Sequence, residues 1–184
     1  MNIFRLDDNP RKAAELQCDK HIPKMIVESA QMLSTTHRML DGIETKCLSK
    51  SGKRMVKYYL LESDLEPIMY KAVHFNHPST VWTRESIENY QWHYEHFVGL
   101  CDEYKYRYGR IHKTDELLRD ILKRPPVNIP KVSETPFKLA MGSNPECMYP
   151  SDPVRSYREF YQTKQDRFKM VWTKRPVPEW FEVK

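Results

Sequence analysis

The segment CDKHIPKMIVESAQ, residues 18–31, contains a thiol, an imidazole, amines and carboxylates within eleven residues. In enzymes such groups act as acids, bases, nucleophiles or metal ligands, yet the segment also has the apolar spacing of a core helix. On a helix, His21, Lys24 and Glu28 lie three and four residues apart and form one polar stripe beside the apolar one. The stripe is either a solvated surface or part of a site.

The sequence supports both interpretations. As a surface, the stripe holds an ion pair between Lys24 and Glu28 that contributes a few tenths of a kcal/mol. As a site, a carboxylate flanked by amines in a partly enclosed groove acts as an acid or base, and an amine kept neutral acts as a nucleophile. The residues alone leave this choice open.

Three pairs of metal-ligand residue types stand one helical turn apart, as zinc ligands often do. They are Cys18 with His21, His74 with His77, and His93 with His96. None belongs to a specific metal signature, and the last pair flanks an aromatic stripe where histidines are ordinary. We therefore predict no metal and no cofactor. Motifs of phosphate-binding loops and serine hydrolases are also missing, and the chain has only 5 glycines, so nucleotide hydrolases are not favoured.

The composition favours one domain with an anionic partner. The chain has 184 residues, 40% of them hydrophobic, and a net charge of +5. Its 25 acidic residues argue against a histone-like polycation. The opening MNIFRLDDNP lacks the apolar run of a signal peptide, no stretch is long and apolar enough for a bilayer, and the 4 cysteines form no C-x-x-C pair. We expect a cytoplasmic protein with reduced thiols and no membrane partner.

The periodicity predicts an all-α fold. Helix signals start at Asn9-Pro10 and run to Leu16, and a second amphipathic pattern extends from Pro23 to Leu40, with Gly42 as a stop. Residues 52–62 and 66–75 are read as two shorter helices.

The second half of the chain adds three more expected helices. An aromatic stripe predicts a helix of roughly 25 residues from near Ser79 to Gly109, and Thr114 is expected to cap the helix TDELLRDILKR. More than half of the 13 prolines fall between 125 and 153, which predicts a loop over about 124–152. A last helix is expected from Ser151 through Phe168. The chain is thus predicted to be a single helical domain over 1–184 with an irregular aromatic and basic tail.

Two blocks of the sequence carry a resemblance. In the first, Asn2-Ile3-Phe4 is followed by Asp19-Lys20-His21, with Glu28 seven residues after the histidine. The second, NHPSTVWTRESIENYQWHYEHFVGLCDEYKYRYG, begins a helix with a histidine and ends in Arg-x-Gly. This order resembles the small all-α pyrimidine-dimer DNA glycosylases of the endonuclease V type from T-even phages. It also looks similar to uncharacterised small proteins of phages and large DNA viruses.

The resemblance implies a base-excision enzyme, an N-glycosylase with or without AP lyase activity, that acts on duplex DNA. In such an enzyme a base is flipped from the duplex, a protein amine attacks C1′ of the sugar, and a glutamate supports the chemistry. The resemblance makes Glu28 the catalytic carboxylate and His21 a nearby orienting or DNA-contacting residue. His77 matches the histidine that begins the later helix.

This chain departs from the family at the nucleophile. The family uses the α-amine that is exposed when the initiator methionine is removed before a small residue, whereas the second residue here is the larger Asn2. The candidate amines are therefore the α-amine of Met1 and the side chains of Lys20 and Lys24, and loss of the chemistry is a further alternative.

Several residues are candidates for contacts with DNA, because cations pair with phosphates and aromatic rings stack on bases. They are Lys20, His77, Arg84, Trp172, Lys174 and Arg175. The competing interpretation for the tail is that its tryptophans pin it to the body of the protein. Two other functions stay open, namely a non-catalytic nucleic-acid or protein binding module and an enzyme that acts on free nucleotides. The oligomeric state also stays open.

Overall fold

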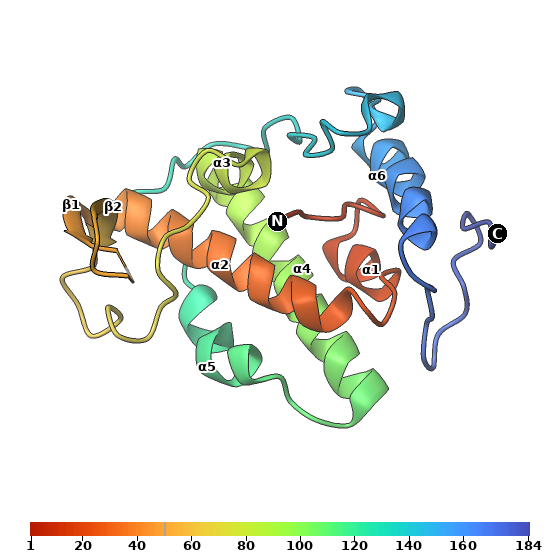
Figure 1. Ribbon diagram of the computed structural model, residues 1–184, viewed down its shortest axis with the longest axis horizontal. Helices are drawn as coiled ribbons and strands as arrows, with labels where there is room; N and C mark the ends of the chain where they lie inside the picture. Colours follow the sequence, from red (N-terminus) through yellow and green to blue (C-terminus); the bar gives the residue numbers. More distant parts are fainter. Residues whose placement is uncertain (50) are drawn as a thin grey trace.

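Helix α4 (Ile87–Tyr108) runs through the middle of the protein in the computed structural model, which describes residues 1–49 and 51–184 (Figure 1). The short α1 (Pro10–Glu15) and the long α2 (Ile22–Asp41) both pack against it. Close packing with α1 explains a glycine inside a helix, because a Cβ at position 99 would lie only 2.9 Å from the Cβ of Ala14.

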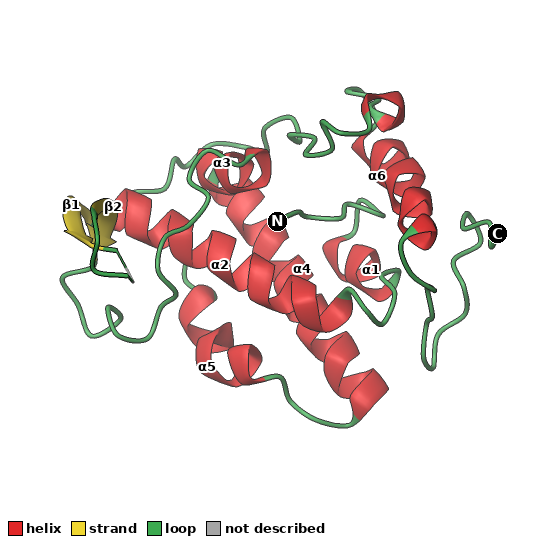
Figure 2. Ribbon diagram, in the orientation of Figure 1, coloured by secondary structure: helices red, strands yellow, loops and turns green. Residues whose placement is uncertain are grey.

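Three further helices complete the helical body. α3 (Pro78–Glu85) packs on α2 and α4, α5 (Lys113–Leu122) packs on the same two helices, and α6 (Pro153–Gln162) lies near the C-terminal tail (Figures 1 and 2). The apolar faces of these elements meet in a hydrophobic core that is rich in aromatic rings, including Tyr157 and Tyr161, which are both fully buried. None of the helices in the described ranges is long and apolar enough to cross a membrane.

Some of the predicted helix boundaries are confirmed. The Asn9 side chain accepts hydrogen bonds from the backbone N–H groups of the first turn of α1, and Pro10 is the first helical residue. α2 ends where Gly42 follows it, and Gly109 ends α4 in the left-handed conformation, with φ of 70°.

The prediction of an all-α fold is wrong, because an antiparallel hairpin follows α2. Its strands are β1 (Ile43–Leu48) and β2 (Met55–Leu60), and residues 52–62, which were predicted to be helical, contain β2. β2 reads MVKYYL, a composition that suits a strand, and Gly52 adopts a positive φ of 69° in the connection. The fold is mixed, with helices and one small sheet.

The helix predicted over 66–75 is also absent from the described structure, and Arg38 provides the reason. The guanidinium of this buried residue donates to the carbonyl oxygens of Glu66, Met69 and Tyr70 at 2.7 to 2.9 Å and to that of Tyr59 at 3.0 Å. It also pairs with the Glu66 carboxylate at 2.6 Å. The loop therefore wraps around a buried cation, and its local backbone bonds, such as that from the Met69 N–H to the Leu65 carbonyl oxygen at 2.9 Å, form a turn and not a continuing helix.

Other helix boundaries differ from the predicted ones, in part because different residues cap the helices. The expected helix from Ser79 to Gly109 breaks at Ser86, whose extended backbone and hydroxyl cap the start of α4. His112, and not Thr114, caps α5. The last helix stops at Gln162, short of Phe168, and the proline-rich segment holds the short 3₁₀ turn Pro145–Cys147.

Candidate active site

The N-terminal segment is fixed firmly in the body of the protein. Ile3 and Leu6 are fully buried. The Asn2 side chain donates from Nδ2 to the carbonyl oxygen of Ala140 at 3.0 Å and accepts from the Tyr157 hydroxyl at 2.8 Å. Since both of these partners are distant in sequence, tertiary contacts hold the first residues in one place.

This anchoring places the N-terminal amine beside Glu28. The α-amine of Met1 lies 3.6 Å from Oε2 of Glu28, and the backbone N–H of Asn2 donates to the same oxygen at 3.0 Å. Oε1 of Glu28 lies 3.6 Å from Nζ of Lys24, one turn earlier on α2. The Glu28 side chain is 15% exposed, so the carboxylate has little solvent around it and amines on both sides.

His77 joins this group from the start of α3. Its Nδ1 caps the helix by accepting from the backbone N–H of Ser79 at 3.3 Å. Burial lowers the pKa of His77, the positive charges of the N-terminal amine and His74 lower it further, and Glu28 opposes the shift. The neutral imidazole is thus favoured close to the amine and the carboxylate. The α-amine of Met1 and the side chain of Lys24 thus lie beside Glu28, and His77 is near enough for its pKa to respond to the charges of the amine and the carboxylate.

His21 lies in the aromatic core and not on the open side of the site. Its ring stacks on Phe4, with 4.8 Å between ring centroids, and Nδ1 bonds to the Tyr161 hydroxyl at 2.7 Å. Burial, together with the nearby cations Lys24, Lys164 and Lys20, lowers the pKa of His21 to about 3. The contact with Phe4 gives His21 a means of positioning the N-terminal segment.

Lys24, which pairs with Glu28, belongs to a group of cations, and we call Lys20, Lys24, Lys164 and Arg167 the basic surface. Nζ of Lys20 lies 4.6 Å from the centroid of the Phe168 ring, and the Lys24 side chain is 63% exposed. Burial, with Arg167 and Lys24 as neighbouring charges, lowers the pKa of Lys164 to about 8. These residues are close enough to raise one another's electrostatic potential, which favours an anionic ligand.

The tail residues predicted to contact DNA lie elsewhere. Nε1 of Trp172 donates to the carbonyl oxygen of Leu16 at 2.8 Å, and Nζ of Lys174 donates to that of Tyr106 at 2.9 Å. Arg175 pairs with Glu103 at 2.6 Å. These contacts attach the tail to α1 and α4, which favours the interpretation that its aromatic residues pin it to the body. Arg84 has a similar structural contact, because Nη1 donates to the carbonyl oxygen of Phe75 at 2.7 Å.

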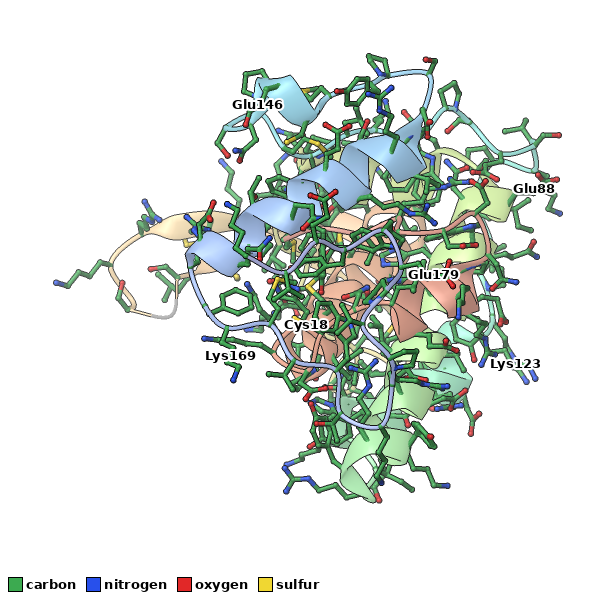
Figure 3. All side chains as sticks on the ribbon, turned by 90° about the vertical axis from the view of Figure 1, so that its right-hand side faces the viewer. Cys18, Glu88, Lys123, Glu146, Lys169 and Glu179 are labelled. Atoms are coloured by element: carbon green, nitrogen blue, oxygen red, sulfur yellow. The ribbon has the colours of Figure 1, made fainter. Side chains whose placement is uncertain are left out.

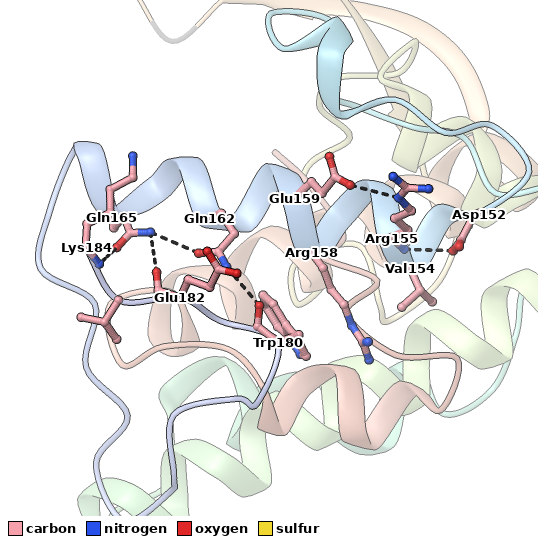
Figure 4. Close-up of a pocket in the computed structure, with 11 residues that line it drawn as sticks. Asp152, Val154, Arg155, Arg158, Glu159, Gln162, Gln165, Trp180, Glu182 and Lys184 are labelled. Carbon is pink, nitrogen blue, oxygen red and sulfur yellow. Dashed lines mark hydrogen bonds and ion pairs between the residues drawn. The ribbon is translucent and has the colours of Figure 1, made fainter.

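Neither the cavity beside α6 nor a cluster of metal ligands adds to the group around Glu28 in the described residues. A cavity of about 600 Å³ lies between α6 and the tail, where Gln162 and Gln165 bond to tail carbonyl oxygens (Figure 4). Figure 3 shows α6 and the tail together on the side of the molecule that holds this cavity. Met1 and Glu28 do not line it. In the parts of the chain that are described, no three histidine, cysteine or acidic side chains converge as a metal site would require.

Sequence reasoning missed three residues that matter here. Asn2 was noted only as an obstacle to methionine removal, yet its side chain anchors the terminus. Tyr157 was assigned only to a helix, and Lys164 was not singled out. The last two come from the opposite end of the chain, so no local spacing connects them with Glu28.

Comparison of the chain with family models, with curated proteins and with solved structures gave no match. The geometry described above therefore carries the functional argument.

Proposed function

We propose that this protein is a DNA-processing base-excision enzyme, an N-glycosylase with or without AP lyase activity, that uses its N-terminal α-amine and Glu28. One observation carries the proposal: the α-amine of Met1 lies 3.6 Å from a Glu28 oxygen at a terminus held by buried hydrogen bonds. Chain termini are usually loosely held, so a fixed α-amine beside a carboxylate on a helix suits nucleophilic catalysis.

The chemistry assigns one role to each group. Glu28 accepts a proton from the amine, and the neutral nitrogen attacks C1′ of the deoxyribose. The N–C1′ bond forms while the bond between C1′ and the base breaks, and the base leaves with the bonding electrons and takes up a proton. Ring opening of the sugar then gives a Schiff base. An α-amine suits this step better than an ordinary lysine, because α-amines are weaker bases and a larger fraction is neutral at pH 7.

The geometry also accommodates either state of the N-terminus. With methionine retained, the amine is that of Met1, 3.6 Å from Oε2 of Glu28. If methionine were removed, the nitrogen of Asn2, now 3.0 Å from the same oxygen, would become the α-amine. A slow removal step before Asn2 therefore does not count against the mechanism.

The basic surface supplies positive charge, which a DNA site needs to bind phosphates and which the Glu28 carboxylate does not provide. Lys24 of this surface pairs with Glu28, and burial together with the charges of Arg167 and Lys24 lowers the pKa of Lys164. A phosphate brought to this surface would reduce the repulsion among the cations. His77, held neutral, is suited to accept or donate a hydrogen bond near the sugar.

The test is trapping with borohydride on duplex DNA that contains an abasic site. Reduction of a Schiff base would give a covalent adduct, and peptide mapping would locate it at residue 1 and not at Lys20 or Lys24. Absence of an adduct from folded, DNA-free protein would overturn the proposal. Salt-dependent DNA binding without an adduct would then indicate a binding module, and nucleotide binding without affinity for duplex DNA would indicate an enzyme of free nucleotides.

A further inference from the structure

The paired strands β1 (Ile43–Leu48) and β2 (Met55–Leu60) project from one end of the molecule, beyond the end of α2 (Figure 1). Leu48 and Met55, directly opposite each other near the tip of this hairpin, are 63% and 55% exposed. An isolated two-stranded hairpin is at best marginally stable in water, so this one depends on its base. There the Arg38 guanidinium and the Tyr59 ring fix it to the body.

The hairpin carries most of the net charge of the chain. Residues 43–60 contain one acidic residue, Glu44, against a set of basic residues: Lys46, Lys50, Lys53, Arg54 and Lys57. This segment alone contributes about +4 of the net charge of +5, so the rest of the chain is nearly neutral. The net positive charge of the sequence therefore comes mainly from this segment.

The pairing of the strands places two lysines opposite each other. Lys46 lies directly opposite Lys57, and like charges at such positions destabilise a hairpin. Lys57 is paired with Glu44 at 2.8 Å, whereas Lys46, Lys53 and Arg54 have no ion pair among the described residues. Both lysines share one face with Leu48 and Met55. An anionic partner on this face would remove the repulsion and cover the apolar side chains.

The position of the hairpin indicates which anion it meets. Glu28 lies in the first half of α2 and Ile43 follows its end, so at 1.5 Å per residue they are about 20 Å apart along the helix. Duplex DNA that lies along α2 rises 3.4 Å per base pair, so the hairpin would reach about six base pairs from the reacting nucleotide. A two-stranded ribbon also fits the width of the major groove.

We propose that the hairpin is a second DNA contact, which binds the phosphates of the duplex about six base pairs to one side of the nucleotide held at Glu28. This inference rests on the proposed action on duplex DNA, but not on the covalent chemistry. It accounts for the exposed cations, the unfavourable Lys46 and Lys57 pair, and the rigid attachment through Arg38.

The experiment compares two variants with the same change in charge. The hairpin variant is Lys46→Gln, Lys53→Gln, Arg54→Gln. The control is Lys105→Gln, Lys113→Gln, Lys123→Gln, at exposed positions on α4, on α5 and just after α5. Fluorescence anisotropy would measure the binding of each to two abasic duplexes, one extending ten base pairs on both sides of the site and one only three, between 50 and 200 mM KCl.

We expect the hairpin variant to bind the long duplex at least tenfold more weakly than wild type, with a salt slope smaller by about 2 to 3, since each lost phosphate contact removes about 0.9. The control should match wild type, and the difference between hairpin variant and wild type should vanish on the short duplex. Equal losses in both triple variants, or equal behaviour on both duplexes, would overturn the inference, as would hairpin-dependent binding to phosphatidylserine vesicles without DNA binding.

Failure of the glycosylase proposal can be distinguished from failure of the hairpin inference by trapping on the short duplex. Trapping of wild type on the short duplex reports the chemistry without the hairpin. No adduct there, combined with hairpin-dependent binding to the long duplex, would refute the glycosylase proposal and keep the hairpin as a DNA contact. An adduct of wild type on the short duplex, combined with equal binding of the long duplex by wild type and the hairpin variant, would support the glycosylase proposal and refute the hairpin as a DNA contact.

Discussion

The backbone N–H of Asn2 donates a hydrogen bond of 3.0 Å to Oε2 of Glu28, joining the first peptide group of the chain to a carboxylate in the middle of the protein. The bond fixes the carboxylate rotamer and the direction of the N-terminus together. Because the α-amine approaches the same oxygen, any shift of the terminus changes the distance between the two reacting groups.

Glu28→Gln should lower turnover on abasic duplex DNA by a hundredfold or more, because the amide keeps the shape of the side chain but accepts no proton from the amine. The backbone bond from Asn2 can still be accepted, so the thermal unfolding midpoint should change little. Glu62→Gln, the same substitution at an exposed position, should have wild-type turnover. An active Glu28→Gln variant would refute the role of the carboxylate.

Extension of the N-terminus by one glycine should abolish the trapped adduct. The added residue moves the α-amine by up to about 3.8 Å, out of reach of Glu28, and converts the present amine into a peptide nitrogen. One glycine added after Lys184 should leave trapping intact. If the extended protein still formed an adduct, mapping it to Lys20 or Lys24 would transfer the nucleophile to that lysine.

Tyr157→Phe should destabilise the protein by about 1 to 3 kcal/mol, because the buried Asn2 amide oxygen and the Ala140 N–H both lose their hydroxyl partner. Urea unfolding would measure this change. Tyr149→Phe removes a hydroxyl that bonds to Glu159 on a more exposed surface and should cost less. Trapping should weaken in the Tyr157 variant beyond what the unfolded fraction explains, since the N-terminus loses its anchor.

The sequence predicted the parts of this fold that depend on local signals. The cap at Asn9, the amphipathic α2 and the glycine stop at 109 all arise from neighbouring residues, and each is confirmed. The hairpin was missed because residues 52–62 were predicted to be a helix, although MVKYYL has the composition of a strand. The conformation of that segment also depends on a non-local contact, because the Arg38 guanidinium donates to the carbonyl oxygen of Tyr59.

Only part of the candidate site could be predicted from the sequence. Glu28, Lys24 and His77 were candidates from their spacing and from the resemblance. In the structure Glu28 lies beside the N-terminal amine, Lys24 lies beside Glu28, and the charge of the amine lowers the pKa of His77. Lys164, whose pKa responds to the charge of Lys24, was not recognised, because it follows the proline-rich loop in the sequence and has no local motif. Trp172 and Arg175 were chosen by composition. Composition does not distinguish side chains that pack against the body of the protein, as these two do, from side chains that are free to contact DNA.

Arg38→Lys should loosen the hairpin while the helical body stays folded. Lysine keeps the charge but lacks the planar fork that serves Glu66 and several carbonyl oxygens, so these buried groups lose partners. We expect a loss of about 3 kcal/mol. Hydrogen exchange should show faster exchange in β1 and β2 than in α4, whereas uniform acceleration across both would contradict the local role of Arg38.

Stability should fall as the pH drops from 7 to 5, before most carboxylates titrate. Burial lowers the pKa of His21 and of His96 to about 3 and that of His37 to about 4, whereas an unfolded histidine titrates near 6.5. Below pH 6.5 the unfolded chain therefore binds protons that the folded protein does not, which favours unfolding. Each of the three should reduce the free energy of unfolding by about 2 kcal/mol between pH 7 and 5.

Guanidinium unfolding at pH 7, 6 and 5 would measure this dependence, and His21→Gln should reduce it by the share of one histidine while lowering stability at pH 7 through the lost bond to Tyr161. A free energy of unfolding that is unchanged between pH 7 and 5 would show that these rings take up protons in the folded protein as readily as in the unfolded chain, which would contradict the effect of burial on their pKa values.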